Sequence, residues 1–465
     1  MSTERELLAG LAPRLAEAVD YALLQGLLKY APDGRLAHAP FSLAPCPIAP
    51  ALHAQLTALT APFGRLAHAV AGDLDFLRET LAPAARVDPF TARLLAMARE
   101  GRGQRSLTLL VTRSDYFLHQ PTPADAPMPR QVELNLISAS YLGLAGRVAR
   151  LHAYLLGGTP PGGRLAPNDP VPPVADAFAE AFRRYGHPEA RVLMVVQPGE
   201  ANVFDQRLLE IALRERGLVT RRLTLEEVAR QGRLREGHLA VGGETMAIAY
   251  FRAAYGPEDF ASEDAYRGRA LIEASSAVTV PHLPAQLAGA KKVQQVLTDP
   301  TLLRRFLGAE DARAVSACFA GQYDLAQPIP AEGAPRPARD VARARAGAFV
   351  LKPQREGGGH NFFDEALVAR LNALQPEEEA AYILMERIRP ARHAALLVRD
   401  GTAREVEAVS EIGRFGVVLV QDGQWLRNED AGYLVRSKAH DTAEGGVSAG
   451  FGYLDSLLLD AGAVA

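Results

Sequence analysis

The stretch AFVLKPQREGGGHN (348–361) joins a strand-like apolar run to a lysine and a glycine triplet. The run AFVLKPQ (348–354) is typical of a buried strand, and it delivers Lys352 to the loop that follows. Backbone N–H groups of such a loop can wrap phosphate oxygens, because glycine has no Cβ that would clash. The stretch therefore predicts a phosphate-binding loop. A solvated surface loop is the alternative, since glycine-rich turns are common.

Carboxylate and amide side chains near this chemistry indicate a metal ion. Glu356 stands beside the glycines, where a carboxylate would repel phosphate unless a cation lay between them. Glu133 and Asn135 are two residues apart in the strand-like run QVELNLIS (131–138), so both lie on one face. Oxygen ligands of this kind suit Mg²⁺. A solvent-facing polar edge is the alternative for the second pair.

The segment MERI (385–388) closes a third strand-like run, AYILMERI (381–388). Its backbone groups can face the edge of an adenine, and Met385 or Ile388 can cover the ring. On its own, however, the segment is explained better as an ordinary core strand.

The distribution of lysines distinguishes the C-terminal part of the chain from the rest. Lys29, Lys291, Lys292, Lys352 and Lys438 are the only lysines, so 51 − 5 = 46 of the basic residues are arginine. A lysine kept in such a chain marks a place where a compact ammonium is needed. The clustering of four of them in the C-terminal part of the chain indicates a phosphate site, with chance retention as the alternative.

Composition excludes several classes of protein. The 465 residues carry a net charge of −3 and are 48% hydrophobic, which is ordinary for a globular protein and gives no basic field for nucleic acid. No apolar run is long enough to span a membrane, and the N-terminus lacks the basic start of a signal peptide. We therefore expect a cytoplasmic protein, in which a disulfide between Cys46 and Cys318 is improbable.

The order of apolar runs predicts a mixed chain. Residues 1 to about 100 have helical spacing, and strand-like runs follow at 106–113 and 131–138. From RVLMVVQ (191–197) to about 289, strands and helices alternate, as in a three-layer unit with a parallel sheet. A long strand pair is expected at 404–421.

Common catalytic signatures are absent or out of context. The sequence contains no G-x-x-x-x-G-K-[ST] phosphate loop, no G-x-G-x-x-G after a strand and no H-E-x-x-H. GVSAG (446–450) matches the nucleophile pattern G-x-S-x-G, but polar residues precede it and no histidine follows His440. We interpret it as a flexible loop of small residues and disfavour a hydrolase.

Taken together, these segments resemble the eukaryotic-type glutathione synthetases, which are ATP-grasp ligases. The resemblance covers nearly the whole chain, and the blocks that carry it are TRSDY (112–116), QVELNLISAS (131–140), NVFDQR (202–207), YFRAAY (250–255), QLAGAKKVQQ (286–295), LKPQREGGGHN (351–361), ILMERI (383–388), SEIGRFG (410–416) and VRSKA (435–439).

The resemblance implies an α/β protein with an ATP-grasp fold, a mobile lid, an inserted α/β substrate domain and an N-terminal helical region. The implied division is 1–190 for the helical region with part of the ATP-grasp core, 191–289 for the substrate domain, and 290–465 for the ATP-grasp domain. The lid falls at about 340–400, and a Gly/Ala-rich loop lies near the end of the chain. A homodimer is implied by the resemblance alone.

The resemblance also assigns site residues. Substrate binding is implied for Arg113, Ser138, Ala139, Ser140, Glu200, Asn202, Gln206, Arg252, Tyr255, Arg436, Val447 and Ser448. ATP binding is implied for Lys291, Lys352, Glu356, Gly357, Gly358, Gly359, His360, Asn361, Phe363, Met385, Glu386, Arg387, Ile388, Glu411, Lys438 and Glu444. The implied magnesium ligands, for two ions, are Glu133, Asn135 and Glu356. The implied catalytic residues are Arg436, Lys291, Lys352 and Arg113.

Four positions depart from the family pattern. His360 precedes Asn361 where the family commonly has Asn-Asn, and Phe363 replaces a tyrosine. Arg387 replaces a lysine, and Ser448 replaces an alanine. Stacking survives the change to Phe363, but a hydroxyl contact is lost.

The implied reaction is the ATP-dependent ligation of γ-glutamylcysteine to glycine through an acyl phosphate, with lids that exclude water. Small residues at 447–450 favour glycine as the acceptor, and a related ligase that uses another amine such as β-alanine is the alternative. A catalytically silent nucleotide-binding protein is a further alternative. It would lack a phosphate lysine or a magnesium ligand, and none is missing from this sequence.

Overall fold

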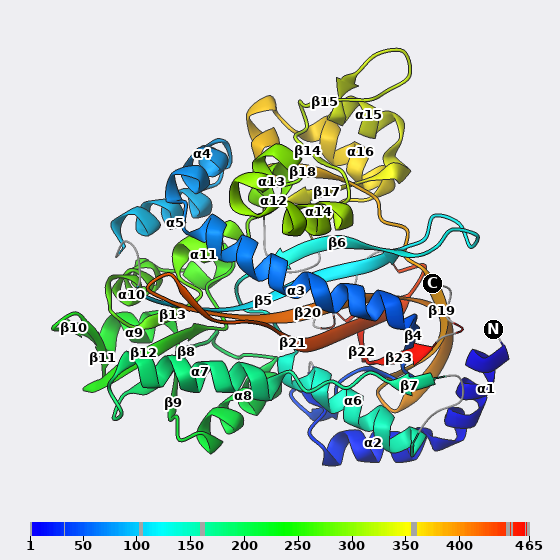
Figure 1. Ribbon diagram of the computed structural model, residues 1–465, viewed down its shortest axis with the longest axis horizontal. Helices are drawn as coiled ribbons and strands as arrows, with labels where there is room; N and C mark the ends of the chain where they lie inside the picture. The colour runs from blue at the N-terminus through cyan, green and yellow to red at the C-terminus, as the bar shows by residue number, and fades with distance from the viewer. Residues whose placement is uncertain are drawn as a thin grey trace.

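A large sheet runs through the middle of the molecule (Figure 1). The structure is a computed structural model, and it describes residues 2–31, 33–101, 106–158, 163–354, 360–442, 447, 450–460 and 462. The large sheet has the strand order β19-β3-β22-β21-β20-β5-β6. Its strands are β3 (Phe41–Ser42), β5 (Leu107–His119), β6 (Met128–Asn135), β19 (Arg392–Arg399), β20 (Thr402–Gln421), β21 (Gln424–Ala439) and β22 (Tyr453–Asp455).

Helices from the first half of the chain cover this sheet or pack beside the helices that do. They are α1 (Ser2–Leu11), α2 (Leu15–Leu24), α3 (Pro50–Ala71), α4 (Leu74–Ala85), α5 (Pro89–Glu100), α6 (Leu142–Leu156) and α7 (Val171–Tyr185). Proline at the first position of α3 and α5 pre-sets the backbone for a helix. Asp73 and Asp88 cap α4 and α5 by accepting the backbone N–H groups of Phe76 and Thr91.

Strand β20 is buried on both faces, because its apolar side chains alternate between two cores. Ile412 and Val418 belong to the core that contains Leu56 of α3. Phe415 and Val417 belong to the core that contains residues of α6 and α7, Phe178 among them. A strand covered on both sides reads as a nearly continuous apolar run, which is what residues 412–420 present.

A second sheet, lower left in Figure 1, contains the region expected to be a three-layer unit. Its strands are β8 (Arg191–Val195), β9 (Thr220–Leu223), β10 (Gly232–Arg235), β11 (His238–Val241), β12 (Glu244–Phe251) and β13 (Val278–Val280). Strand β12 pairs in parallel with β8 and β13, and β8 pairs in parallel with β9. Strands β10 and β11 add an antiparallel extension that the sequence pattern did not reveal.

Short helices surround the second sheet and lead to the upper part of the molecule. They are α8 (Val203–Glu215), α9 (Leu225–Gln231), α10 (Glu263–Ala274), α11 (Leu283–Ala288), α12 (Lys291–Val296), α13 (Pro300–Phe306) and α14 (Ala309–Cys318). A capping box at the start of α9 pairs Thr224 with Glu227.

The upper lobe in Figure 1 holds a small antiparallel sheet of order β14-β18-β17. Its elements are β14 (Gln322–Tyr323), β15 (Pro328–Ile329), β16 (Arg336–Pro337), α15 (Ala338–Ala344), β17 (Phe349–Pro353), α16 (Asp364–Ala373) and β18 (Tyr382–Glu386). Leu351 and Leu384 pack in its own small core. The strands expected at 348–354 and 381–388 are therefore present as β17 and β18.

Two local expectations were wrong. The region before residue 100 also contains the short strands β1 (Leu28–Tyr30), β2 (Leu36–His38) and β4 (Cys46–Ile48), and β4 pairs with β23 (Leu457–Asp460), which also pairs with β7 (Gly163–Leu165). Residues 404–421 form one strand and not a pair, since their partner is β21. Gly413 and Gly416 lie inside β20 and do not interrupt it.

Within the described ranges, every helix is too short or too polar to cross a bilayer.

The close packing of β5 and α3 against Gly416 gives a stability prediction. A Cβ at this position would lie 2.6 Å from Thr112 Oγ1 and 2.9 Å from Thr60 Cγ2. We expect Gly416→Ala to lower the free energy of unfolding by about 1–3 kcal/mol, the usual result of overpacking, measured by denaturant titration. Gly10→Ala in α1 is the control, because an added Cβ there meets nothing within 4 Å. Equal stability of the two variants would contradict the prediction.

Candidate active site

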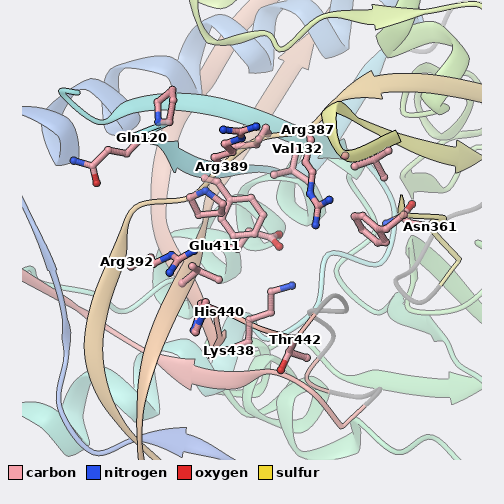
Figure 2. Close-up of a pocket in the computed structure, with 18 of the residues that line it drawn as sticks. Gln120, Val132, Asn361, Arg387, Arg389, Arg392, Glu411, Lys438, His440 and Thr442 are labelled. Atoms are coloured by element: carbon pink, nitrogen blue, oxygen red, sulfur yellow. The ribbon is translucent and has the colours of Figure 1, made fainter. Parts of the chain in front are cut away.

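A cavity of about 1090 Å³ opens between the upper lobe and the large sheet. Figure 2 shows that Arg387 and Asn361 border it on one side, while Lys438 extends into it from β21 on the other. Val132 of β6 and Glu411 of β20 also line it. The volume is near the upper end of the range for small-molecule sites.

Most residues expected to bind ATP line this cavity. They are Lys352, Asn361, Phe363, Met385, Glu386, Arg387, Ile388, Glu411 and Lys438. His360 is exposed and lines a smaller neighbouring pocket with Gln354 and Tyr382. Sequence reasoning missed Arg389, Arg392 and His440, which also line the large cavity. Arg389 and Arg392 lie just beyond the strand that ends at Glu386, so their proximity to MERI was the available signal.

Side-chain contacts order the end of the cavity formed by β18. Tyr323 donates a hydrogen bond to Glu386 Oε1 over 2.8 Å, and Arg387 pairs with Asp364 Oδ1 over 2.7 Å. The Arg387 guanidinium lies 5.6 Å from the centre of the Phe363 ring, so the two departures from the family pattern are in contact with each other. Met385 is buried, which gives this end of the cavity an apolar floor.

A buried carboxylate, Asp115, joins β5 to β21. Arg113 donates to both of its oxygens over 2.7 and 2.8 Å, and Arg436 Nη2 lies 3.1 Å from Oδ2. Burial alone would raise the pKa of Asp115, but the two guanidinium groups outweigh it and hold that pKa below its usual range. Sequence reasoning missed Asp115, although period-two geometry places it on the same strand face as Arg113.

Arg436 also contacts the carboxylate of Glu411, its partner across β20 and β21. Burial raises the pKa of Glu411, and the Arg436 guanidinium opposes that rise without cancelling it. A charged chain therefore runs from Arg113 through Asp115 and Arg436 to Glu411 at the cavity wall.

The two lysines expected at the phosphates converge on β6. Lys352 Nζ donates to the carbonyl of Val132 over 3.0 Å, and Lys291 Nζ lies 3.8 Å from Glu133 Oε2. Both lysines are 6% exposed. Burial lowers the pKa of Lys352 to about 8, and the neighbouring Lys291 acts in the same direction. Two ammonium groups this close to each other suit a ligand with several negative charges.

The proposed magnesium ligands can be tested against this geometry. Glu133 lies opposite Asp115 and Asn135 lies opposite Arg113, so their side chains share one face of β6. Asn135 donates its Nδ2 to Asp115 Oδ2 over 2.9 Å, so its carbonyl oxygen is the group left to act as a ligand. A carboxylate and an amide oxygen side by side fit a hard cation. The described residues contain no group of three carboxylate, histidine or cysteine ligands, and Glu356 lies outside them.

A second group of predicted residues surrounds Ser140, after the end of β6. Arg252 donates to Ala139 O over 2.8 Å and to Ser140 Oγ over 2.9 Å. Arg113 donates to Ser140 O over 3.1 Å, so Ser140 joins the two arginines. Ser138 has a left-handed φ of 50°, and such strain is common where backbone is shaped for a ligand.

Asp205, another residue that sequence reasoning missed, holds this turn in place. Its carboxylate accepts the backbone N–H groups of Tyr141, Gly143 and Leu144 at distances of 2.7 to 3.2 Å. Arg252 Nη2 lies 3.6 Å from the same carboxylate. The position of Asp205 within the block NVFDQR (202–207) was the sequence feature that could have indicated its role.

The remaining predicted substrate residues lie beside the second sheet. Glu200 accepts the backbone N–H of Asn202 over 2.7 Å and the Nε2 of Gln206 over 2.6 Å. Tyr255 accepts a hydrogen bond from Gln197 over 3.0 Å, and burial raises the pKa of its hydroxyl. Hydrogen-bond donors and acceptors are therefore gathered near Arg252.

Several predictions fall on residues outside the described ranges. They concern Glu356, Gly357, Gly358, Gly359, Glu444 and Ser448. Val447 is described and is buried.

Comparison with known proteins identifies the family. The profile of the family described as "Eukaryotic glutathione synthase, ATP binding domain" matches residues 11–459. The chain belongs to this family. It is 39% identical to the glutathione synthetase of Homo sapiens, with 95% of each chain covered. It is 40% identical to the chloroplastic glutathione synthetase of Arabidopsis thaliana, over 92% of this chain and 80% of the relative.

A solved structure supports the glutathione synthase fold. A glutathione synthetase-like effector from Globodera pallida, in its apo form, superposes with a TM-score of 0.77 at 21% identity, and 96% of each chain is covered. The expected α/β fold is confirmed. Family membership makes the chain a ligase with ATP as a substrate.

The buried ammonium of Lys352 makes this glutathione synthase fold less stable. Its pKa of about 8 lies well below the ordinary lysine value, a difference worth on the order of 3 kcal/mol at neutral pH, of which the hydrogen bond to Val132 offsets about 1 kcal/mol. We expect Lys352→Met without nucleotide to be about 2 kcal/mol more stable at pH 7 in denaturant titrations.

The difference in stability between the wild type and Lys352→Met depends on pH. Between pH 8 and about pH 10.4 the unfolded chain binds the lysine proton more tightly than the folded one, so wild-type stability rises with pH and the advantage of the variant shrinks. Arg86→Met, at an exposed arginine, is the control with no such trend. An advantage that is the same at neutral and alkaline pH would argue against a buried charged lysine.

Proposed function

We propose that this chain joins γ-glutamylcysteine to glycine, with ATP as the energy source. The observation that supports the proposal is the chain of contacts from Ser140 through Arg113, Asp115 and Arg436 to Glu411. It connects the group of residues proposed to hold the dipeptide with the cavity proposed to hold the nucleotide. The relatives named glutathione synthetase in plants and animals support the same substrates.

We propose that Arg252 and Arg113 orient the dipeptide, because guanidinium groups bind carboxylates through paired hydrogen bonds. Glu200 and Gln206 present an acceptor and a donor beside them, which suits the amino-acid end of the γ-glutamyl group. Tyr255 adds a hydroxyl at the same site. Ser138, Ala139 and Asn202 complete this proposed set.

The chemical step starts at the cysteinyl carboxylate. One of its oxygens attacks the γ-phosphorus of ATP, the bond from that phosphorus to ADP breaks, and an acyl phosphate forms. Lys291, Lys352 and Arg436 neutralise the charge that develops on the transferred group. The glycine amine then attacks the acyl carbon, phosphate leaves and the new amide loses a proton. No covalent bond to the enzyme is required.

Magnesium is proposed as the metal, held by Glu133 and Asn135 with Glu356. Two bound ions would neutralise phosphate charge and align the γ-phosphate. The carboxylate of Glu133 lies 3.8 Å from Lys291 Nζ and its charge also acts on Lys352, so a cation that it holds would lie in the same charged region as both ammonium groups.

The deciding assay measures tripeptide by mass and phosphate release. We expect turnover to require ATP, Mg²⁺, γ-glutamylcysteine and glycine together, and to be faster with glycine than with β-alanine. Lys352→Met should lose at least about 100-fold in kcat, because a charge that stabilises the transition state is removed. A faster rate with β-alanine would favour the alternative acceptor. ATP binding without turnover would favour a silent nucleotide-binding protein.

We propose a homodimer formed through an apolar surface near the N-terminus. Tyr30 and Leu36 face each other across β1 and β2 and are 48% and 55% exposed, and Leu24 at the end of α2 is 82% exposed. Exposed apolar clusters of this kind are typical of subunit contacts. We expect sedimentation to give a dimer for the wild type and a monomer for Tyr30→Glu. Leu234→Glu, at an exposed leucine of the second sheet, should remain dimeric.

A cytoplasmic location is proposed from the cysteines. Cys46 and Cys318 are both buried and free, as is usual in a reducing compartment. Cell fractionation with an antibody to the chain would test the location.

A further inference from the structure

Four polar side chains form a continuous chain of hydrogen bonds near the Glu411–Arg436 pair. His393 Nε2 lies 2.7 Å from Ser410 Oγ, and Ser410 Oγ lies 2.7 Å from Ser437 Oγ. Ser437 Oγ lies 2.6 Å from Asp455 Oδ2. Asp455 and Ser437 are 0% exposed, so water cannot replace either partner.

This chain lies on the opposite face of the sheet from the cavity. Ser410 and Ser437 are partners across β20 and β21, and the next pair along the strands is Glu411 with Arg436. Successive residues of a strand point to opposite faces, so the serines lie directly behind the charged pair. His393 lies opposite Ala408 and therefore on the face of Ser410.

Both ends of the chain are fixed. Asp455 Oδ1 accepts the backbone N–H of Ser456 over 2.7 Å and that of Cys46 over 3.3 Å. At the other end, His393 Nδ1 lies 3.2 Å from the carbonyl of Ala394. A carbonyl oxygen only accepts, so Nδ1 carries a hydrogen in this contact.

A count of hydrogens shows that the chain needs one extra proton. Its four contacts are Nδ1 to Ala394, Nε2 to Ser410, Ser410 to Ser437 and Ser437 to Asp455. The Cys46 thiol also contacts the Ser410 side chain, but it brings its own hydrogen and leaves this count unchanged. The two hydroxyls supply two hydrogens and the Nδ1–H group supplies a third. The fourth must sit on Nε2 of His393 or on the carboxyl of Asp455. If it is on neither, one contact has no hydrogen.

We propose that His393, Ser410, Ser437 and Asp455 share one proton along this chain and thereby position the Glu411–Arg436 pair for the ligase reaction. With the proton on His393 the hydrogen bonds run toward Asp455, and with the proton on Asp455 they run toward His393. In both arrangements all four contacts are made. Loss of the proton breaks one contact and leaves β20 and β21 less firmly joined behind the charged pair.

The other titratable groups around Asp455 stay neutral when this proton is exchanged. Burial raises the pKa of the Cys46 thiol and of the Tyr433 hydroxyl, and it lowers the pKa of His152 to about 4. Burial also raises the pKa of Asp455 to about 7. The carboxyl of Asp455 therefore keeps its proton in mildly acid solution and loses it as the pH rises through neutrality.

The charged side chains near these four hydrogen-bonded residues lie elsewhere. Arg392 and Glu407 pair over 3.0 Å on the cavity side of β19 and β20. Glu4 of α1 is the smallest of the influences that raise the pKa of Cys46. Arg392, Glu407 and Glu4 therefore form none of the four hydrogen-bond contacts.

Asp455→Asn is the decisive variant. Its amide oxygen can accept the two backbone N–H groups and its NH₂ can donate to Ser437, so it mimics the protonated carboxyl at every pH. We expect the ratio of kcat of the wild type to kcat of Asp455→Asn to fall roughly three- to tenfold between about pH 6 and about pH 8.5, the value of one hydrogen bond, with little change in KM. Asp422→Asn, in the exposed turn between the same strands, is the matched control and should give a constant ratio.

A second pair of variants tests the middle of the chain. Ser437→Ala should lower kcat at all pH values, and Ser437→Thr, which keeps the hydroxyl, should restore both kcat and the wild-type pH profile. A constant ratio for Asp455→Asn, or a Ser437→Thr profile like that of Ser437→Ala, would overturn the proposal and leave these residues a purely structural role.

A spectroscopic readout separates this proposal from the proposed reaction. In infrared difference spectra of the protein without substrates, we expect the band of a protonated carboxyl group to disappear as the pH rises. The band should be absent in Asp455→Asn and unchanged in Asp422→Asn. If the wild type lacks this band below pH 7, or if Asp455→Asn keeps it, the proton is not shared with Asp455 and the proposal is overturned.

Discussion

The buried contact between Asp115 and two arginines is the constraint on which the rest of the structure depends. A carboxylate with no exposed surface is unfavourable unless guanidinium groups neutralise it and fill its hydrogen-bonding capacity. Arg113 on β5 and Arg436 on β21 do so from opposite sides of β20. Strand β20 lies between them. It can do so only because residue 413 is glycine, since a Cβ at this position would collide with Asp115 and Arg113. The charged centre fixes the order and spacing of three strands.

The same constraint places the two halves of the proposed reaction next to each other. Arg113 contacts Asp115 on one side and Ser140 on the other, and Ser140 in turn accepts Arg252. Two contacts, Arg113 with Asp115 and Asp115 with Arg436, thus join the proposed dipeptide site to Arg436, which in turn contacts Glu411 at the cavity wall. This arrangement suits a ligase in which phosphoryl transfer should occur only when the acid to be activated is in position.

The fold could be predicted where apolar patterning was strong, and the site where chemistry is concentrated in short motifs. The strand that ends near Lys352 and the alternation from Arg191 onward were both evident from the order of apolar residues. The single strand at 402–421 was not, because Gly413 and Gly416 are there for close approach between strands, and sequence patterns do not distinguish this from a turn. Asp115 and Asp205 were missed for a related reason. Their roles depend on partners distant in the chain, and only the folded structure brings those partners together.

The scarcity of lysine has a consequence for the chemistry of the protein surface. All five lysines lie in the described part of the chain, and none of them is exposed: three are buried, and Lys29 and Lys438 are partly covered. Cations on the outside are almost entirely guanidinium groups, which acylating reagents and acetyl-transfer enzymes do not modify at neutral pH. Amine-directed labelling of this protein therefore reports mainly on the lysines in and around the proposed nucleotide cavity and on the partly covered Lys29, while the rest of the solvent-facing surface is nearly silent to it.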